Sequence, residues 1–318
     1  LLNKEMLNMY PLKMKPVIKD IIWGGNKMKE MFGKEYDFEK AGESWEVSTN
    51  SAGKSIIANG ELSGMTLADA IAKYPEIAGK TLDDFPLMLK IIDANSDLSI
   101  QVHPGDDYAA KHENGARGKT EMWYIISAEP DAKIGYGLKK PMSNDEIRAA
   151  IEKGNLEEYI RYINVRAGET YFIPAGTIHS ICSGLVIAEL QENSNITYRL
   201  YDYNRTDKNG NKRELHVDKA LDVIQQTTSA PEPSIDDGSQ EKNLVYCNYF
   251  VCDVVNPDKT YDDCTVEGYH ILFFKDGSGE ISYSGGKEKF AAGDTFIIPK
   301  SLGKYSVSGK CSYLKCYE

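Results

Sequence analysis

The chain has 318 residues, 41% of them hydrophobic, and a formal net charge of -11 at pH 7. This length is enough for one large domain or two ordinary domains with a sizeable core. The charge argues against a general nucleic-acid binder, and an anionic ligand would need a local basic pocket built against the overall field.

No stretch of the sequence approaches the length of a membrane span, and the N-terminal residues lack a continuous apolar run, so we expect no membrane association. Six cysteines occur without a C-x-x-C pair: Cys182, Cys247, Cys252, Cys264, Cys311 and Cys316. A chain of this length does not need disulfides to hold its core together. We therefore expect reduced thiols in a cytoplasmic protein.

The first predicted helix covers residues 67–72, with Thr66 as its N-terminal cap. A short strand is predicted over residues 99–103. Because side chains two residues apart project from the same face of a strand, Gln101 and His103 point together and the apolar residues beside them point away. One short strand can thus supply two metal ligands.

Two later segments offer further ligands. Residues 120–126 are typical of a strand, so Glu121 could enter from a neighbouring strand. Residues 168–179 predict a strand, a Pro/Gly turn and a returning strand that would bring His179 back over the same sheet. Two imidazoles, a carboxylate and an amide oxygen suit a divalent first-row metal, above all zinc, with room for water or substrate. Because Gln is an uncommon zinc ligand, Gln101 could instead hydrogen-bond to the ligands.

Two more helices are predicted downstream. Ser143 and Glu146 have the spacing of a capping box, and the helix that they open is expected to end at Gly154. A further helix is predicted around residues 216–225, where apolar side chains recur at helical spacing. The other three histidines, His112, His216 and His270, are expected on the surface or in the core.

The chain divides at a polar, proline-containing run. We predict a catalytic domain with helical insertions over residues 1–226, a linker over 227–243, and a smaller β domain over 244–318.

Motifs at the predicted ligands carry a family resemblance. Residues 168–179 match the second cupin motif, G-x5-P-x-G-x2-H, and residues 101–104 together with 118–124 resemble the type I phosphomannose isomerases. The remaining segments that look like the short bacterial form of this family are residues 22–25, 42–48, 93–99, 191–194 and 197–203. The match is dense from about residue 10 to 225 and continues weakly to the end. It implies a mainly β protein of two cupin-like jelly-roll β-barrels with helical insertions.

The sequence of the predicted second barrel repeats a motif of the first barrel but lacks the predicted metal ligands. Residues 293–299 line up with residues 168–174, but Lys304 stands where the first copy has His179, and no Gln-x-His precedes it. A duplicated barrel of this kind is typical of a structural or dimer-forming partner, which leaves a homodimer open.

The resemblance implies a zinc-dependent aldose-ketose isomerase that interconverts mannose 6-phosphate and fructose 6-phosphate through a cis-enediol. One Zn²⁺ per chain would be held by Gln101, His103, Glu121 and His179. Arg199 matches the family's active-site arginine, and its guanidinium would face the enediolate. The proton would be moved by Lys119, which shares a strand face with Glu121, or by a zinc-bound water. The phosphate would be anchored by other Lys, Arg or Ser groups at the barrel mouth, with Lys90 a weaker candidate.

Two other classes of protein use similar ligands. An iron cupin oxygenase also employs two imidazoles and a carboxylate, although it would not explain Arg199 or the position of Lys119 beside Glu121. A non-catalytic cupin that binds a metal and a sugar phosphate is the second alternative. An isomerase assay with and without chelator separates these hypotheses.

Overall fold

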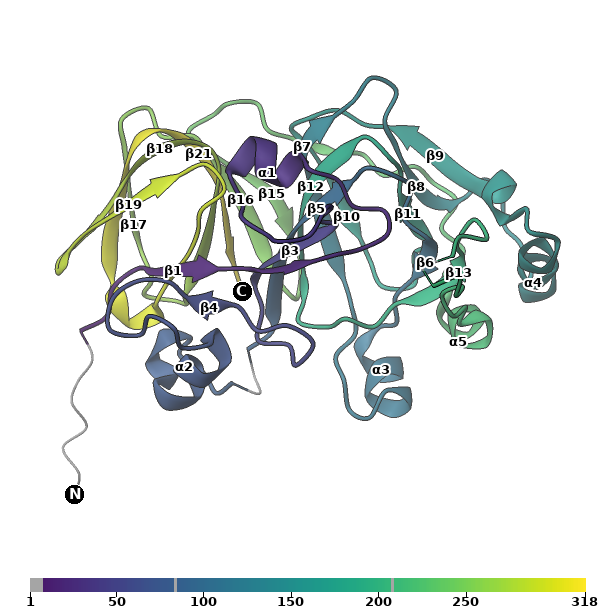
Figure 1. Ribbon diagram of the computed structural model, residues 1–318, viewed down its shortest axis with the longest axis horizontal. Coiled ribbons are helices and arrows are strands. Elements are labelled where there is room, and N and C mark those ends of the chain that lie inside the picture. The colour runs from purple at the N-terminus through teal and green to yellow at the C-terminus, as the bar shows by residue number, and fades with distance from the viewer. Residues whose placement is uncertain (1–7, 83–84, 207–208) are drawn as a thin grey trace.

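The computed structural model describes residues 8–82, 85–206 and 209–318. Two β-barrels lie side by side along the long axis of the molecule, and the helices are short and peripheral (Figure 1). The expected mainly β architecture of two cupin-like barrels with helical insertions is therefore confirmed. Within the described residues, no helix is both long and apolar enough to cross a membrane.

Two sheets form the first barrel. The larger one contains, in spatial order, β14 (Ser234–Ile235), β10 (Glu169–Ile173), β7 (Glu121–Ala128), β12 (Leu185–Glu192), β5 (Leu87–Ala94), β3 (Glu43–Val47) and β2 (Val17–Lys19). The smaller one contains β13 (Tyr198–Tyr201), β6 (Ile100–Val102), β11 (His179–Ile181), β8 (Lys133–Leu138) and β9 (Ile160–Asn164).

The central strands of the larger sheet are buried on both faces. In β12, Val186 and Ala188 face the core between the barrels, whereas Leu185 and Ile187 face the interior of the first barrel. Strand β5 alternates in the same way. Such strands appear in the sequence as nearly continuous apolar runs, so the few polar residues on their inner faces stand out as candidates for a site.

A nine-stranded sheet forms the second barrel. Its main path is β15 (Glu241–Tyr246), β16 (Val251–Val255), β21 (Lys304–Tyr317), β18 (His270–Tyr283), β20 (Thr295–Ile298), β1 (Leu12–Lys15) and β4 (Ile56–Ile57), with β17 (Thr260–Cys264) on β21 and β19 (Gly286–Ala291) on β18. Two of these strands, β1 and β4, come from the N-terminal part of the chain (Figure 1).

These pairings mean that the barrels do not follow a simple division of the chain. The predicted first domain contributes β1 and β4 to the second barrel, and β14, inside the predicted linker, pairs with β10 of the first. The largest hydrophobic cluster lies between the barrels and joins residues of both. The boundaries at residues 226 and 243 stay a prediction.

Five α-helices are found in the described residues: α1 (Lys27–Phe32), α2 (Leu67–Lys73), α3 (Asp106–His112), α4 (Asn144–Lys153) and α5 (Val217–Val223). The predicted caps are present, because Thr66 accepts a hydrogen bond from the Asp69 amide and Ser143 forms a capping box with Glu146. Helix α4 ends at Gly154, whose left-handed backbone suits glycine. Three short 3-10 helices complete the list: η1 (Pro75–Ile77), η2 (Leu156–Tyr159) and η3 (Lys300–Leu302).

The repeated motif has the same backbone in both barrels. Gly168 precedes β10 with φ 87°, and Gly293 stands just before β20 with φ 88°, a conformation that other residues adopt only with strain. Lys304 is the first residue of β21 just as His179 is the first residue of β11. Lys304 is exposed, so the repeat in the second barrel preserves the glycine turn but not the buried histidine.

Candidate metal centre

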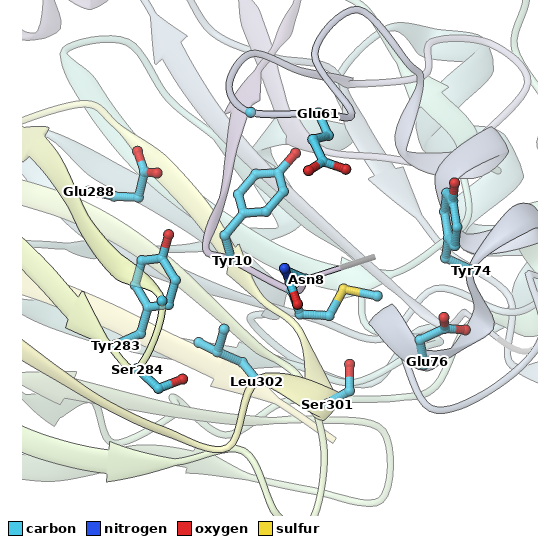
Figure 2. Close-up of a pocket in the computed structure, with 13 residues that line it drawn as sticks. Asn8, Tyr10, Glu61, Tyr74, Glu76, Tyr283, Ser284, Glu288, Ser301 and Leu302 are labelled. Carbon is cyan, nitrogen blue, oxygen red and sulfur yellow. The ribbon is translucent and has the colours of Figure 1, made fainter. Parts of the chain in front are cut away.

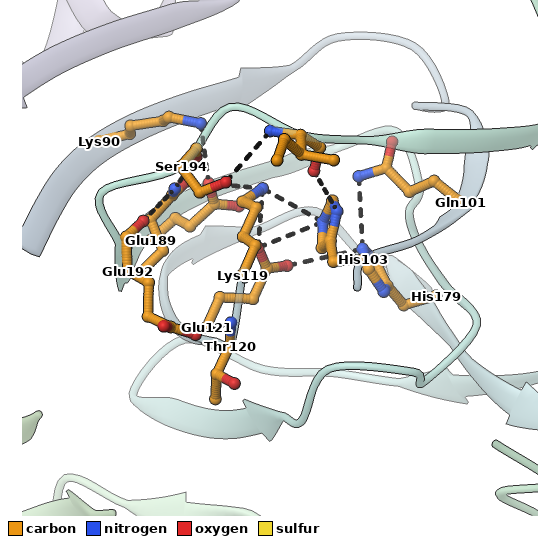
Figure 3. Close-up of polar contacts among 12 residues, drawn as sticks. Lys90, Gln101, His103, Lys119, Thr120, Glu121, His179, Glu189, Glu192 and Ser194 are labelled. Atoms are coloured by element: carbon orange, nitrogen blue, oxygen red, sulfur yellow. Dashed lines mark hydrogen bonds and ion pairs between the residues drawn. The ribbon is translucent and has the colours of Figure 1, made fainter. Parts of the chain in front are cut away.

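Three predicted ligands meet inside the first barrel. Their ligand atoms, from His103, Glu121 and His179, all lie within 4.8 Å of one another, and all three side chains are buried (Figure 3). Glu121 Oε2 is 3.4 Å from His103 Nε2, and Glu121 Oε1 is 3.5 Å from His179 Nε2. This is the one cluster of His, Cys, Asp or Glu within residues 8–82, 85–206 and 209–318 that could hold a metal ion.

The two imidazoles arrive from the smaller sheet and the carboxylate from the larger one. His103 follows β6 by one residue, and His179 pairs with Gln101 across β11 and β6. The expectation that His179 returns over the same sheet as the preceding strand is wrong, because β10 pairs with β7 whereas β11 pairs with β6 and β8. The Pro/Gly turn crosses between the sheets, which places His179 opposite Glu121.

Hydrogen bonds orient both imidazoles for coordination. His103 Nδ1 lies 2.8 Å from the Ile196 carbonyl and His179 Nδ1 lies 2.9 Å from the Thr177 carbonyl. Since a carbonyl only accepts, Nδ1 carries the proton and Nε2 keeps its lone pair toward Glu121. Burial lowers the pKa of His179 to about 4 and holds that of His103 well below its usual range, so both rings are neutral at neutral pH.

Glu121 lacks the hydrogen-bond donors that a buried carboxylate needs. Its two oxygens are fully buried and make no hydrogen bond among the described residues, although Lys119 Nζ approaches Oε2 to 2.9 Å as an ion pair. Burial and the nearby Glu189 carboxylate raise the pKa of Glu121 to about 7. A cation between the carboxylate and the two Nε2 lone pairs would satisfy all three groups, so these residues fit a divalent metal.

Gln101 lies beside the cluster on β6, as the strand alternation predicted. Its amide nitrogen is 3.3 Å from His179 Nε2, and its oxygen accepts a hydrogen bond of 3.0 Å from Ser99. With the amide in this orientation, its nitrogen rather than its oxygen faces the metal cluster. Rotation of the amide by 180° would exchange the two atoms, and a ligand role for Gln101 stays a prediction.

A chain of buried charges extends from Glu121 along the inner face of the larger sheet. Lys119 Nζ is 3.1 Å from His103 Nε2 and 3.6 Å from Glu189 Oε1, which is in turn 3.1 Å from Lys90 Nζ (Figure 3). Burial alone would lower the pKa of Lys119, but the carboxylates of Glu121 and Glu189 more than offset it and raise the pKa above its usual range. Lys119 therefore remains an ammonium ion.

Sequence reasoning did not identify Glu189. This glutamate lies on β12 within the run LVIAELQE, and its side chain is buried in the barrel interior. The available signal was a charge on the face of β12 that Leu185 and Ile187 also occupy, but recognising that face requires knowing that both sides of the strand are buried.

A cavity of about 490 Å³ lies beside the cluster. Gln101 and Lys119, which contact the cluster, line this cavity together with Glu189. Arg199 lines it from β13 of the smaller sheet, and Arg213 lines it from the loop between β13 and α5. Arg199 on β13 lies directly opposite Gln101 on β6, so the predicted arginine shares the face of the predicted ligands. Its Nη1 donates to the Glu214 carbonyl at 2.8 Å, and no carboxylate within 4 Å neutralises it in the described structure. Burial lowers the pKa of Arg199.

The other histidines lie apart from this cavity. His112 stacks on Tyr108 at the end of α3, His216 is half-buried before α5, and His270 is buried in the second barrel. None of them joins the cluster, as the sequence analysis expected.

A larger hollow of about 780 Å³ lies between the second barrel and the end of α2, and shares no described lining residue with the cavity at the cluster. Figure 2 shows three tyrosines and three carboxylates around it: Tyr10, Tyr74, Tyr283, Glu61, Glu76 and Glu288. Within the described part of the chain no Lys or Arg lines this hollow, so its carboxylates disfavour anions and it does not suit a phosphorylated substrate.

Two family models match the chain. Residues 11–132 match the model described as phosphomannose isomerase type I, catalytic domain, and residues 240–318 match mannose-6-phosphate isomerase, cupin domain. Mannose-6-phosphate isomerase ManA of Bacillus subtilis is 36% identical over 312 residues, covering 96% of this chain and 97% of that protein. Mannose-6-phosphate isomerase of Streptococcus mutans is 34% identical over 305 residues, covering 94% of this chain and 95% of its own.

Solved structures agree with these matches. The crystal structure of the mannose 6-phosphate isomerase from Bacillus subtilis has a TM-score of 0.91 and 34% identity, covering 98% of this chain and 100% of that one. A variant of the phosphomannose isomerase from Salmonella typhimurium has a TM-score of 0.74 at 15% identity, covering 97% and 99% of the two chains, and so supports the fold alone.

Proposed function

Because the chain belongs to the type I phosphomannose isomerase family, an enzyme family, we propose that it interconverts mannose 6-phosphate and fructose 6-phosphate. The observation that carries the proposal is the buried His103, Glu121 and His179 cluster, which lies next to a cavity lined by Lys119 and Arg199. We further propose one Zn²⁺ per chain, because two neutral imidazoles and a carboxylate are typical zinc ligands that leave positions open.

The metal would supply Lewis-acid stabilisation of negative charge on a sugar oxygen. The chain itself contributes the orientation of the ligands: the Ile196 and Thr177 carbonyls fix both Nε2 lone pairs toward Glu121. Gln101 is proposed as a weaker fourth ligand.

Proton transfer between C1 and C2 through a cis-enediol requires a group that exchanges a proton with the sugar oxygens as charge develops. Lys119 is proposed for this role because it lines the cavity and its carboxylate neighbours keep Nζ protonated. In that state Nζ is suited to donating a proton to a sugar oxygen and not to removing one from carbon. The base that takes the proton from C2 and returns it to C1 would then be the other candidate, a water held by the metal.

Arg199 is proposed to stabilise the enediolate. Its guanidinium lines the cavity on the same strand face as Gln101, and no carboxylate within 4 Å competes for it among the described residues. A fixed positive charge next to developing negative charge lowers the barrier more than it strengthens substrate binding.

Cellular location is part of the proposal. The six cysteines are free thiols, and they motivate a cytoplasmic protein. Titration of six reduced thiols in protein isolated from its host without reductant would support this, and fewer than six would oppose it.

A coupled isomerase assay tests the function directly. Turnover of mannose 6-phosphate that is lost with a chelator and restored by zinc is the expected result. Turnover that resists complete metal removal would exclude the metal-dependent mechanism. Oxygen consumption in place of isomerisation would identify an iron oxygenase, and binding of the sugar phosphate without turnover would identify a non-catalytic cupin.

A further inference from the structure

The charges deep in the cavity and those at its mouth are arranged differently. In the deep part, Lys90 Nζ lies 3.1 Å from Glu189 and 3.9 Å from Glu43, and Lys119 is paired with Glu121. These ammonium groups are already neutralised by carboxylates. Lys90 is therefore poorly suited to hold a phosphate, which would have to displace a buried ion pair.

The mouth carries a surplus of positive charge. The buried carboxylate of Asp202 pairs with both Arg205 and Arg213. Arg199 lies nearby, and burial together with the positive charge of Arg213 lowers its pKa. Arg205 and Arg213 share one carboxylate, and Arg199 has none within 4 Å among the described residues, so these three guanidinium groups exceed their carboxylate partners by two positive charges. In a chain of net charge -11, this is the local basic pocket that an anionic substrate requires.

Of the two arginines that Asp202 holds, Arg213 alone lines the cavity. Its Nε donates to Asp202 Oδ2 at 2.8 Å and its Nη2 donates to Oδ1 at 2.6 Å. This two-point contact fixes the plane of the guanidinium and leaves Nη1 without a partner among the described residues. Arg205, by contrast, bonds to Asp202 and to the Asp97 carbonyl and lies outside the cavity.

We propose that Arg213, oriented by Asp202, anchors the phosphate group of the substrate. The inference rests on the proposed function for the identity of the sugar, while the anion site itself follows from the charges. A guanidinium presents N–H groups in a planar fork that matches phosphate oxygens, and a preoriented fork loses little freedom on binding. The phosphate at Arg213 would hold the sugar across the cavity from Lys119, with Arg199 beside it.

Steady-state kinetics of Arg213→Ala tests the assignment. The KM for mannose 6-phosphate is expected to rise about 10-fold to 100-fold with kcat nearly unchanged, since a phosphate contact acts equally in ground and transition states. The affinity for inorganic phosphate, measured by calorimetry on the metal-loaded protein, should fall by a similar factor. Unchanged KM and unchanged phosphate affinity would overturn the proposal.

Three variants separate contact from folding. Arg213→Lys retains the charge and loses the fork, so it should fall between wild type and Arg213→Ala even if the alanine variant is unstable. Arg205→Ala perturbs the same Asp202 outside the cavity, and Arg148→Ala removes an exposed charge paired with Asp218. The Arg148→Ala control should keep a normal KM. Arg205→Ala, which removes one charge from the pocket without removing a group that lines the cavity, should raise KM less than Arg213→Ala, and an equal rise would attribute the effect to the loop and overturn the assignment.

Failure of the function and failure of this inference give different results. If wild-type protein shows no isomerase activity and loses phosphate binding only on Arg213→Ala, the anion site stands and the proposed function falls. If wild-type protein is active and Arg213→Ala binds phosphate normally, the inference falls and the function stands.

Discussion

The three residues of the metal cluster differ from ordinary buried polar groups because their ligand atoms lie within 4.8 Å of one another and both Glu121 oxygens lack a hydrogen bond among the described residues. His103→Ala, Glu121→Ala and His179→Ala are each expected to remove most bound zinc and to lower kcat by at least about 100-fold, because the loss of a ligand removes the Lewis acid. Metal content by emission spectroscopy and the coupled assay on the same samples provide the measurement.

A matched control for these variants is His112→Ala, since His112 stacks on Tyr108 at a helix end. It should retain both metal and activity. Circular dichroism should report a folded chain for all four variants. Near-normal turnover in metal-free His179→Ala would contradict a metal role for the cluster.

Gln101 is expected to contribute less than the imidazoles. Its amide nitrogen faces His179, and its oxygen is engaged by Ser99, so coordination would require reorientation of the amide. Gln101→Ala should weaken zinc affinity less than His103→Ala, because water can replace a neutral oxygen donor. Competition titrations with a chelating dye measure both affinities, and equal losses would show that the amide is a full ligand.

Arg199 allows a separation of catalysis from binding. Arg199→Ala is expected to lower kcat about 100-fold to 1000-fold with zinc retained and KM changed little, because the contact is made mainly in the transition state. Arg199→Lys keeps the charge and loses the planar fork, so it should recover only part of the rate. An increase in KM at constant kcat would instead assign Arg199 to ground-state binding.

At the scale of single elements, the second barrel contains a pH-dependent contact at the start of β18. His270 Nδ1 is 2.8 Å from the Tyr305 hydroxyl and 3.7 Å from Asp263. Burial lowers the pKa of His270 to about 4, against the partly opposing effect of Asp263. Because the folded pKa lies below the unfolded value of about 6.5, the stabilising contribution is complete above pH 6.5 and is lost as the pH falls toward 4.

His270→Phe should therefore make the free energy of unfolding less dependent on pH below pH 6.5. Between pH 6.5 and 4, the free energy of unfolding of the wild type is expected to fall by up to about 3 kcal/mol more than that of the variant. Urea denaturation of the zinc-loaded proteins at several pH values measures the difference. Parallel profiles for the two proteins would show that the pKa of His270 does not differ between the folded and unfolded states.

At the scale of the whole molecule, a buried polar contact joins the two barrels. Glu46 on β3 receives hydrogen bonds from Ser44 at 2.6 Å and from Thr295 of the second barrel at 2.8 Å, and lies 2.7 Å from Lys34 Nζ. Lys34 also donates to the Gly293 carbonyl at 2.9 Å. The contact thus ties β3 to the turn that opens β20.

Glu46→Ala should destabilise the protein by about 3–5 kcal/mol, because it leaves the ammonium of Lys34 buried without its carboxylate. Thr295→Val, which removes a single hydrogen bond, should cost only about 1–3 kcal/mol. Denaturant unfolding measures both effects. A loss below 1 kcal/mol in Glu46→Ala would show that the barrels are held together by their shared apolar core alone.

The sequence by itself determined the features that follow from local rules. Strand alternation placed Gln101 and His103 on one face, hydrogen-bonding side chains marked the starts of α2 and α4, and the repeated glycine turn revealed the second barrel. The strand alternation and the helix caps depend on residues that are a few positions apart, so local periodicity and capping rules are enough to predict them. Periodicity alone would not have shown the second barrel, because turns of this kind are common in all-β proteins.

Only the tertiary structure decided which distant residues share the site. His179 lies in the sheet opposite Glu121, β1 and β4 complete the second barrel, and Glu189 and Arg213 enter the cavity from strands and loops far apart in the sequence. These positions depend on how two sheets pair and close so that the apolar faces of both barrels are buried together. That choice is made by the whole chain at once, and no local pattern in 318 residues records it.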